Sequence, residues 1–326
     1  MVPSGQMRAP AVIPRVLRGE AYGVAFEARV DDRRLVAAVR ARFPPGWTRT
    51  RQDPSVVLSL VHEQVQEVSD TSARASRRTG AHGRSRAVVG LSVRVDGQGL
   101  ARGLSHAQAL DVFESELQLW VARLARPEGF VHAGVVALDA RAILVPGRSG
   151  TGKTTLVRAL VEAGATYYSD EYAVLDREGR VHPYARRPSV RMGAGHKERA
   201  PVPRLRGRGP VPVGMIVETR YSTDGRWNPT PLSAGECVLA LLANTVPARD
   251  RPAEVLSVLA RAAGGARGFR SHRRAAKQTA RSLLALARSL AGDMTSARVA
   301  ASREAGPRPR LGVSRGRPGP GRQSGR

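Results

Sequence analysis

Cysteine is nearly absent from this chain of 326 residues, whose one cysteine is Cys237. A single cysteine excludes an internal disulfide framework and a cysteine-rich metal site. Aromatic residues make up only 4% of the chain, so its core has to be built mainly from Leu, Val and Ala. No apolar run approaches the roughly 20 residues that a membrane span needs, and the opening MVPSGQMRAP lacks the apolar stretch of a secretory signal. These absences predict a cytoplasmic protein with no membrane partner.

Acidic residues are also scarce, with 27 Asp and Glu against 53 Lys and Arg, which gives a net charge of +26. Residues 265–326 hold fifteen Lys or Arg against two acids (Asp293 and Glu304), so +13 lies in the last fifth of the chain. A basic segment can bind nucleic acid through counterion release, but no aromatic interleaving or recognition motif supports that here. A solvated, disordered tail is therefore favoured over a nucleic-acid partner.

The N-terminal region, residues 1–127, has the pattern of a small α+β fold. Its first 18 residues carry three prolines and no periodic pattern, which is typical of unstructured chain. Apolar runs predict strands over residues 20–30, 55–61 and 87–95. Asp31-Asp32 and Ser105 are N-cap residues that predict helices to about residues 42 and 124. The polar, basic stretch 69–86 predicts a loop.

The second region, residues 128–292, has the pattern of an α/β domain. Short apolar runs predict strands over residues 130–138, 142–145, 165–169 and 213–218, and a hairpin over residues 173–182. Amphipathic patterns predict helices over residues 154–163, 233–243, 252–262 and 274–291. Residues 193–212, rich in Gly, Pro and Arg, predict a loop. The expected fold class is therefore α/β, with a disordered basic tail over residues 293–326.

A glycine-rich motif lies between the predicted strand 142–145 and the helix that follows. It reads Gly147-Arg148-Ser149-Gly150-Thr151-Gly152-Lys153-Thr154, which fits G-x-x-x-x-G-K-[ST] at every fixed position. Glycines let backbone N–H groups approach phosphate oxygens, and the following helix N-terminus favours an anion. Lys153 can reach the β- and γ-phosphates, and the Thr154 hydroxyl can ligate Mg²⁺. The strand–loop–helix context predicts a nucleotide site formed by this phosphate loop and the adjoining Thr155.

A pair of carboxylates, Asp170 and Glu171, ends the predicted strand 165–169. The carboxyl end of a parallel strand lies at the same edge of a sheet as the phosphate loop. One carboxylate can bind Mg²⁺ together with Thr154, and the other can accept a proton from an attacking hydroxyl. Adjacent residues on a strand point to opposite faces, so both can act only if the chain turns there. A solvated acidic turn is the alternative interpretation.

His132 stands out among the seven histidines because it lies near the start of the strand that feeds the phosphate-loop strand. A lone histidine is more often a packed or surface residue than a catalytic one. The other six histidines support no hypothesis, and no pair has metal-ligand spacing on a predicted helix. The sequence alone therefore leaves the role of His132 open.

Three segments together resemble the catalytic domain of HPr kinase/phosphorylase. They are Val131-His132-Ala133-Gly134-Val135, the phosphate loop, and Tyr168-Ser169-Asp170-Glu171. The resemblance is closer still to the HPr-kinase-like proteins found beside peptide-maturation genes. It covers residues 129–191 well, with weaker similarity in the amphipathic helix before it and over residues 214–262. The ordered combination is much more specific than the phosphate loop alone.

This resemblance implies a fold related to phosphoenolpyruvate carboxykinase, a mixed sheet with the P-loop at its edge. It implies ATP and Mg²⁺ as cofactors and a serine hydroxyl of a peptide or small protein as the acceptor. Asp170 would take the hydroxyl proton, Glu171 stands where the family commonly has a second aspartate, and His132 would lie close to Asp170 and tune it. A homo-oligomer is also compatible with the resemblance.

The chain departs from the true HPr enzymes after the acidic pair. It lacks their glycine-rich signature, and its residues 191–208 are basic and proline-rich, which argues against phosphorolysis and against HPr as the substrate. The cations here would attract an acidic peptide or a free C-terminal carboxylate, unless they form a solvated loop; they are Arg186, Arg187, Arg191, Lys197, Arg199, Arg204, Arg206 and Arg208. Two other functions stay open: an NTPase that drives an assembly partner, and a nucleotide-sensing or nucleic-acid-associated binding protein.

Overall fold

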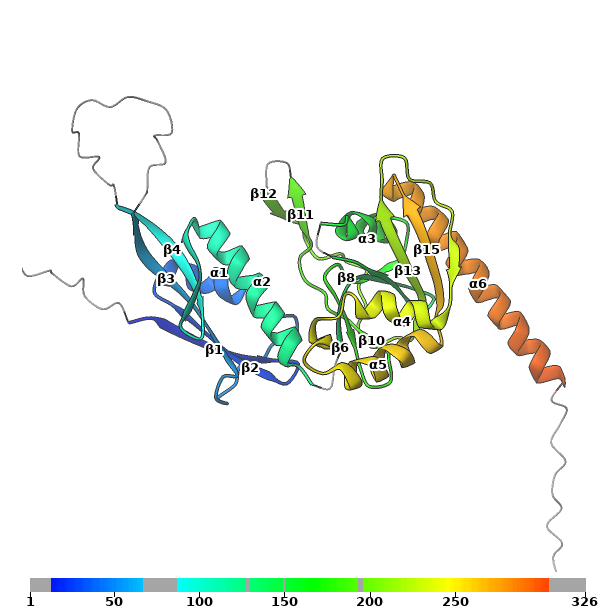
Figure 1. Cartoon of the computed structure of the whole chain (residues 1–326), viewed down its shortest axis with the longest axis horizontal. Helices are drawn as coiled ribbons and strands as arrows, with labels where there is room; N and C mark the ends of the chain where they lie inside the picture. Colours follow the sequence, from blue (N-terminus) through cyan, green and yellow to red (C-terminus); the bar gives the residue numbers. More distant parts are fainter. Residues whose placement is uncertain (1–12, 67–86, 127–128, 149, 193–195, 305–326) are drawn as a thin grey trace, which may run out of the picture. The chain divides into compact units, whose positions relative to one another are not determined.

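The computed structural model describes residues 13–66, 87–126, 129–148, 150–192 and 196–304 (Figure 1). Residues Met1–Leu284 form one compact unit, and a second unit begins at Ala285. The chain mixes helices with strands, so the expected α/β composition is confirmed. No helix within the described ranges is long and apolar enough to cross a membrane. The loop expected over residues 69–86 lies outside the described residues.

The first sheet has five strands in the order β1-β2-β3-β4-β5, with only β2 and β3 parallel. Their bounds are β1 Arg15–Ala21, β2 Val24–Val30, β3 Val56–Gln66, β4 Ala87–Val95 and β5 Gln98–Leu104. Tyr22 and Gly23 have φ values of 53° and 70°, as in two-residue hairpin turns that match the twist of the strands. The single strand expected over residues 20–30 is therefore a hairpin, and residues 15–18 are not unstructured but belong to β1.

Two helices pack with this sheet. They are α1 (Val36–Arg40), which follows a 3-10 turn (Arg33–Leu35), and α2 (His106–Leu124). α2 contacts β3, β4 and β5, and α1 contacts α2. Asp32 Oδ1 accepts a hydrogen bond from Arg34 N at 2.8 Å. Ser105 forms a capping box with Gln108 at the start of α2. Both predicted N-caps are confirmed, because a short polar side chain satisfies backbone N–H groups that the helix leaves unpaired.

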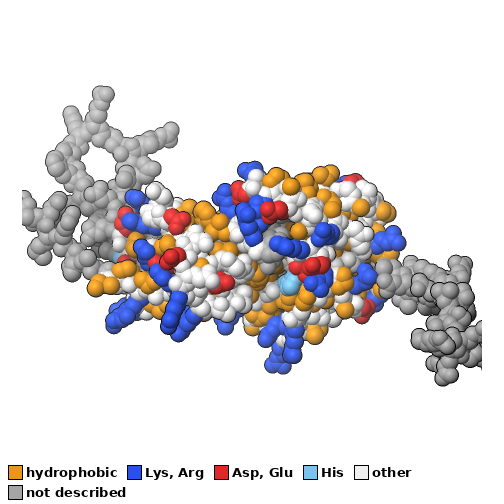
Figure 2. Space-filling model, turned by 90° about the horizontal axis from the view of Figure 1, so that it is seen from below, with side chains coloured by type: hydrophobic (Ala, Val, Ile, Leu, Met, Phe, Trp, Pro, Cys, Tyr) orange, Lys and Arg blue, Asp and Glu red, His pale blue; other side chains and the backbone are white. Residues whose placement is uncertain are grey.

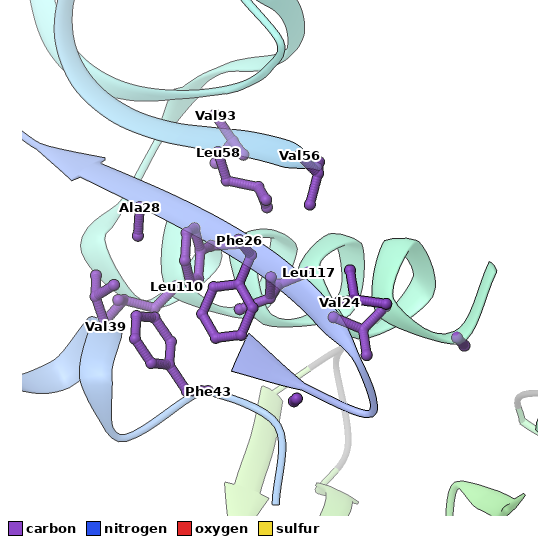
Figure 3. Close-up of a cluster of buried hydrophobic side chains, with 14 of the residues drawn as sticks. Val24, Phe26, Ala28, Val39, Phe43, Val56, Leu58, Val93, Leu110 and Leu117 are labelled. Carbon is purple, nitrogen blue, oxygen red and sulfur yellow. The ribbon is translucent and has the colours of Figure 1, made fainter. Parts of the chain in front are cut away.

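The core of the first sheet is a cluster of apolar side chains from β2, β3, β4, α1 and α2 (Figure 3). Phe26 and Phe43 meet edge to face with ring centroids 4.8 Å apart. The same cluster includes Phe130, Tyr172, Val174 and Tyr184, which belong to the second region of the chain. Near residue 127, where the sequence predicted a boundary, the chain passes from the first sheet to the second. Side chains from both sides of this position pack in the same core cluster.

The second sheet has eight strands, in the order β10-β9-β6-β7-β13-β15-β14 with β8 also paired to β6. Their bounds are β6 Gly129–Leu138, β7 Arg141–Pro146, β8 Thr166–Ser169, β9 Tyr172–Leu175, β10 Val181–His182, β13 Val213–Tyr221, β14 Thr230–Leu232 and β15 Arg267–Arg273. β7, β13 and β15 run parallel, and the remaining pairs are antiparallel. A separate hairpin pairs β11 (Ser189–Met192) with β12 (His196–Arg199), so the loop expected over residues 193–212 is wrong for β12.

Helices cover both faces of the second sheet. α3 (Lys153–Glu162) packs on one face, where a Cβ on Gly134 of β6 would lie 2.5 Å from Val157 Cγ2. α4 (Ala234–Leu242) and α5 (Pro252–Gly264), joined by a 3-10 turn (Val246–Ala248), pack their apolar side chains with the odd-numbered β6 residues from Val131 to Ala137. Because side chains alternate along a strand, His132 lies on the α3 face together with Gly134.

The last helix, α6, runs from Ala276 to Glu304, about a dozen residues beyond the end expected from the sequence. This stretch contains no proline and is rich in Ala and Arg, which are good helix formers. Ala280, Leu283 and Leu284 of its first part are buried. The helix therefore continues through residues 293–304, which the sequence pattern had assigned to the tail.

Candidate functional site

The strand directions bring the predicted site residues to one edge of the second sheet. β7 and β8 are both antiparallel to β6, which lies between them, so β7 and β8 run in the same direction. The phosphate loop follows β7, Asp170 follows β8, and His132 lies near the start of β6 at the same edge. Gly147 N donates to His132 O at 3.1 Å, which ties the start of the loop to β6.

The acidic pair lies in an interruption between two strands. β8 and β9 pair with the same side of β6, and Asp170 and Glu171 fall between them. Ser169 Oγ accepts hydrogen bonds from Glu171 N at 3.1 Å and Tyr172 N at 3.0 Å, which stabilises a turn. On a regular strand the two neighbouring carboxylates would point to opposite faces. Because the chain bends here, both can line the same pocket, and both do.

The phosphate loop has the backbone that its glycines predict. Gly150 and Gly152 have φ values of 85° and 81°, in the left-handed region that favours glycine. Serine side chains cap α2 and α4, whereas Gly152 stands at the N-cap of α3 and no side chain of the described chain caps it. The backbone N–H groups of the first turn of α3 are therefore available to an anion. Ser149 lies outside the described residues.

Lys153 is folded back onto the loop. Its Nζ donates to Gly147 O at 2.5 Å and to Arg148 O at 2.7 Å. Burial lowers the pKa of Lys153, while the carboxylates of Glu171 and Asp170 act in the opposite direction. The ammonium is thus held inside the loop by two backbone carbonyls. A phosphate oxygen could replace these carbonyls as the acceptor of its hydrogen bonds. Arg148, Gly150, Thr151 and Thr155 of the predicted set are exposed at the loop.

Asp170 is 4% exposed and accepts two hydrogen bonds. Thr154 Oγ1 donates to Asp170 Oδ2 and Tyr167 OH donates to Asp170 Oδ1, each at 3.0 Å. Burial raises the pKa of Asp170, while the Arg186 guanidinium lowers it. The Thr154 hydroxyl and the Asp170 carboxylate are oxygen ligands of the kind that Mg²⁺ takes together with waters and phosphate oxygens. The predicted metal ligands Thr154 and Asp170 are therefore adjacent.

His132 lies against Glu171 and Tyr172. Its Nδ1 is 3.6 Å from Glu171 Oε1, and its ring centroid is 4.5 Å from that of Tyr172. Burial lowers the pKa of His132, with Glu171 opposing this effect, so the imidazole is neutral at neutral pH. The resemblance implied a position close to Asp170, whereas the contact that the structure gives is with the neighbouring carboxylate of Glu171.

Helix α2 forms the opposite wall of a pocket of about 490 Å³ that the phosphate loop, His132, Asp170 and Glu171 line. Its contribution includes Glu114 and Gln118, which are buried and joined by a hydrogen bond from Gln118 Nε2 to Glu114 Oε1 at 3.2 Å. The helix was predicted from its Ser105 cap, and no functional role was predicted for its side chains. Two polar residues four positions apart on the apolar face of a helix were the signal that could have revealed it.

The basic segment reaches the pocket through Arg186 and Arg199. Arg186 Nη1 donates to Gln118 Oε1 at 2.5 Å and lies 3.9 Å from Glu171 Oε2, and Arg199 forms an ion pair with Glu114. Arg187, Arg204, Arg206 and Arg208 are exposed and do not line the pocket, and the side chains of Arg191 and Lys197 are outside the described set. On the face shown in Figure 2, Lys and Arg side chains form separate groups with Asp and Glu among them.

A cation that the sequence analysis missed contacts the phosphate loop from β15. Arg273 Nη2 donates to Thr151 O at 2.7 Å. β15 itself was not predicted, because Arg267–Arg273 is a polar run without the alternation of a half-buried strand. Its place beside β13 comes from tertiary pairing that leaves no local signal.

A second group of donors lies away from this pocket, on the first sheet. Ligand atoms of Asp32, His62 and His106 all lie within 4.8 Å of one another, and both histidines are exposed. The 3-10 turn and α2 begin at Asp32 and Ser105, and the positive ends of helix dipoles disfavour a cation there. We therefore assign the functional site to the pocket beside the phosphate loop.

Comparison with models of known protein families found no match for this chain, and comparison with curated proteins found none either. The function therefore has to be argued from the pocket itself. It contains a glycine-rich loop ahead of an uncapped helix N-terminus, a hydroxyl in contact with a buried carboxylate, and a second carboxylate beside a neutral imidazole.

Proposed function

We propose that this chain is an ATP- and Mg²⁺-dependent kinase that transfers the γ-phosphoryl group to a serine hydroxyl of a peptide or small protein. Its catalytic region would be a P-loop core of the phosphoenolpyruvate carboxykinase-like type, similar to HPr kinase. The observation that carries the proposal is the 3.0 Å hydrogen bond between Thr154 Oγ1 and Asp170 Oδ2. It joins the loop that would hold the phosphates to the carboxylate that would act on the acceptor.

Nucleotide binding would use the backbone of the loop first. The N–H groups in the first turn of α3 have no side-chain cap and could donate to phosphate oxygens, and Lys153 would add a positive charge beside the β- and γ-phosphates. Mg²⁺ would be held by the Thr154 hydroxyl and Asp170, with Glu171 close by. Bound there, the ion neutralises charge that develops on the phosphoryl oxygens.

Phosphoryl transfer would use the acidic pair. Asp170 accepts the proton of the serine hydroxyl while the serine oxygen bonds to phosphorus and the bond to the β-phosphate oxygen breaks. Tyr167 and Thr154 each donate a hydrogen bond of 3.0 Å to Asp170 and would orient its carboxylate for this step. Glu171 would stay beside Asp170 with the Arg186 guanidinium 3.9 Å and the His132 imidazole 3.6 Å from its carboxylate oxygens.

The acceptor would enter between the phosphate loop and α2. The exposed cations of residues 187–208 favour an acidic peptide, although Arg186 and Arg199 already have carboxylate or amide partners within the protein. If these cations attract the peptide over a distance, added salt should weaken that attraction as the Debye length falls toward about 8 Å. The KM for the acidic peptide should then rise with ionic strength. A KM that ignores salt, or a preference for basic peptides, would remove this part of the proposal.

The function is tested with γ-labelled ATP, serine peptides of both charges, and a matched pair of lysine variants. Lys153→Ala should lose most ATP affinity and all transfer, because the charge inside the loop is lost. Lys277→Ala is the control, since that lysine is 82% exposed and lies on α6. Equal ATP affinity in wild type and Lys153→Ala would refute the nucleotide site. Release of phosphate to water with no labelled peptide would indicate an NTPase instead, and binding without turnover a nucleotide sensor.

A further inference from the structure

Arg273 is a buried guanidinium that pairs with no carboxylate of the described residues. It ends β15, is 3% exposed, and its Nε is buried with no hydrogen-bond acceptor among the described residues. Burial lowers its pKa, and the Tyr221 ring lies 5.9 Å from its Cζ. The one hydrogen bond that the described side-chain N–H groups of Arg273 make is to Thr151 O in the phosphate loop.

Another buried arginine, Arg251, shows how the chain usually satisfies such a group. Arg251 is 7% exposed, and it donates to Ala125 O at 2.7 Å and to Glu254 Oε2 at 3.5 Å. A buried cation left without an anion is costly, because the low-dielectric interior does not replace its lost hydration. Arg273 therefore differs from Arg251 in lacking the negative charge that would offset its burial.

We propose that Arg273 is a positioning residue of the phosphate loop, and that the polyphosphate of a bound nucleotide offsets its charge from the other side of the loop. This inference rests on the proposed nucleotide-binding function. The strand order places it there: β15 is parallel to β13, and β13 to β7, so all three strands end at the edge where the loop begins. Arg273 thus reaches the loop from two strands away.

The peptide that Arg273 contacts is one that must point correctly for an anion to bind. In a planar trans peptide the C=O of one residue and the N–H of the next point in opposite directions. By holding Thr151 O, Arg273 directs the N–H of Gly152 to the opposite side of that peptide, away from the guanidinium. Loop N–H groups of this kind are what hold phosphate oxygens.

Residue 152 and Arg273 also fit each other sterically. A Cβ on Gly152 would lie 2.7 Å from Arg273 Nη2, and the φ of 81° is itself strained for any other residue. The guanidinium thus occupies the space that the glycine leaves open. The contact braces the loop from outside, and the positive charge adds to the field that an anion meets inside it.

A purely structural role for Arg273 gives a different expectation. In that case its removal lowers the stability of the nucleotide-free protein, and any loss of binding follows from unfolding. In a positioning role, the nucleotide-free protein keeps its melting temperature, because an uncompensated buried charge is removed along with one hydrogen bond. What falls is the affinity for phosphates and the stabilisation that they confer.

The experiment compares Arg273→Ala, Arg273→Gln and Arg273→Lys with Arg270→Ala in the full chain. Arg270 is the control because it lies on the same strand, is 52% exposed and pairs with Glu218 at 2.8 Å. Affinities for ATP, ADP, adenosine and inorganic tripolyphosphate are measured by calorimetry, with melting temperatures in parallel. We expect Arg273→Ala to bind ATP and tripolyphosphate about 10- to 100-fold more weakly, with adenosine affinity unchanged and Arg273→Lys intermediate.

Three outcomes separate this inference from the function on which it rests. If wild type binds none of the phosphates, the proposed nucleotide site is wrong and the inference falls with it. If wild type binds ATP and Arg273→Ala binds it equally well, only the inference is overturned. If all three Arg273 variants melt several degrees lower without ligand, and Arg273→Lys recovers no phosphate affinity, the residue is structural and the positioning role is refuted.

Discussion

Replacing Asp170 by asparagine should separate catalysis from stability at one position. The change removes the proposed proton acceptor but keeps the shape of the side chain and leaves the phosphate loop intact, so ATP binding should persist while transfer falls by about a hundredfold or more. Each tenfold corresponds to about 1.36 kcal/mol, so the barrier should rise by roughly 2.7 kcal/mol or more. Glu171→Gln should lower the transfer rate less, because Glu171 is only half-buried and Thr154 donates its hydrogen bond to Asp170 and not to Glu171.

The effect of Asp170→Asn on stability should have the opposite sign. The carboxylate is buried, and its one strongly attractive cation, Arg186, does not offset the cost of burial, so its pKa is raised in the folded state. The folded state therefore binds the proton more tightly than the unfolded state. Stability is then lost as the pH rises from about 4, the unfolded pKa, through the raised folded pKa. Asparagine carries no charge and avoids this loss.

The magnitude is a balance of two terms. The amide of the introduced asparagine would accept only one of the hydrogen bonds that Thr154 and Tyr167 donate to Asp170, a loss of about 1 kcal/mol. Removing a buried charge from a neighbourhood that disfavours it returns roughly 1–4 kcal/mol. We expect a net gain on the order of 1 kcal/mol at pH 7, about 2–4 °C in Tm for a domain of this size. At pH 4 the two proteins should melt together.

Transfer of label from γ-labelled ATP and thermal melting between pH 4 and 8 measure both effects. Asp176→Asn is the matched control, because burial raises the pKa of Asp176 less than the Arg180 and His182 hydrogen bonds lower it. That variant should lose stability at neutral pH, with the difference vanishing as the pH falls through the lowered pKa, and should keep its transfer rate. Full transfer activity in Asp170→Asn, or a lower Tm at pH 7 than wild type, would show that the reasoning on Asp170 is wrong.

Two further predictions concern the core and the C-terminal end. Phe113→Ala should destabilise the protein by about 3–5 kcal/mol, because its side chain is fully buried on α2 in the first core cluster; chemical denaturation measures this, and a loss below about 1 kcal/mol would mean that the cluster is loosely packed. Deleting residues 300–326 should leave Tm and ATP turnover unchanged, because the last buried side chains described in α6 are Leu283 and Leu284; a drop of several degrees would show that the removed segment packs.

Local signals predicted the elements that begin with a recognisable cap or motif. Ser105 predicted the start of α2, because an N-cap needs only neighbours in sequence. The phosphate loop was predicted for the same reason, since its glycines and Lys153 form a continuous run. β4, with alternating Val89, Leu91, Val93 and Val95, has the bounds that its alternation predicts.

The elements and contacts that were missed depend on residues far apart in sequence. β5 is mostly exposed and contains two glycines, and β14 has three residues, so neither has the composition of a strand. Whether His132 meets Asp170 or Glu171 depends on the register of β6 with β9, which pairs His132 with Tyr172. The roles of Glu114 and Arg273 depend on which surfaces face the phosphate loop, and spacing along the chain does not encode that.

The core cluster shared by the two sheets also determines which amino-acid substitutions should destabilise this protein. Tyr172 follows Glu171 directly, Tyr184 lies two residues before Arg186, and both are packed with Phe130 against Tyr22 and the first core. A fragment beginning at residue 129 would leave these three aromatic rings uncovered, so we expect it to aggregate when produced without the first sheet. Harmful natural variants should accordingly occur among the core residues of β2 and α2 as often as beside the pocket, although those core side chains do not line it.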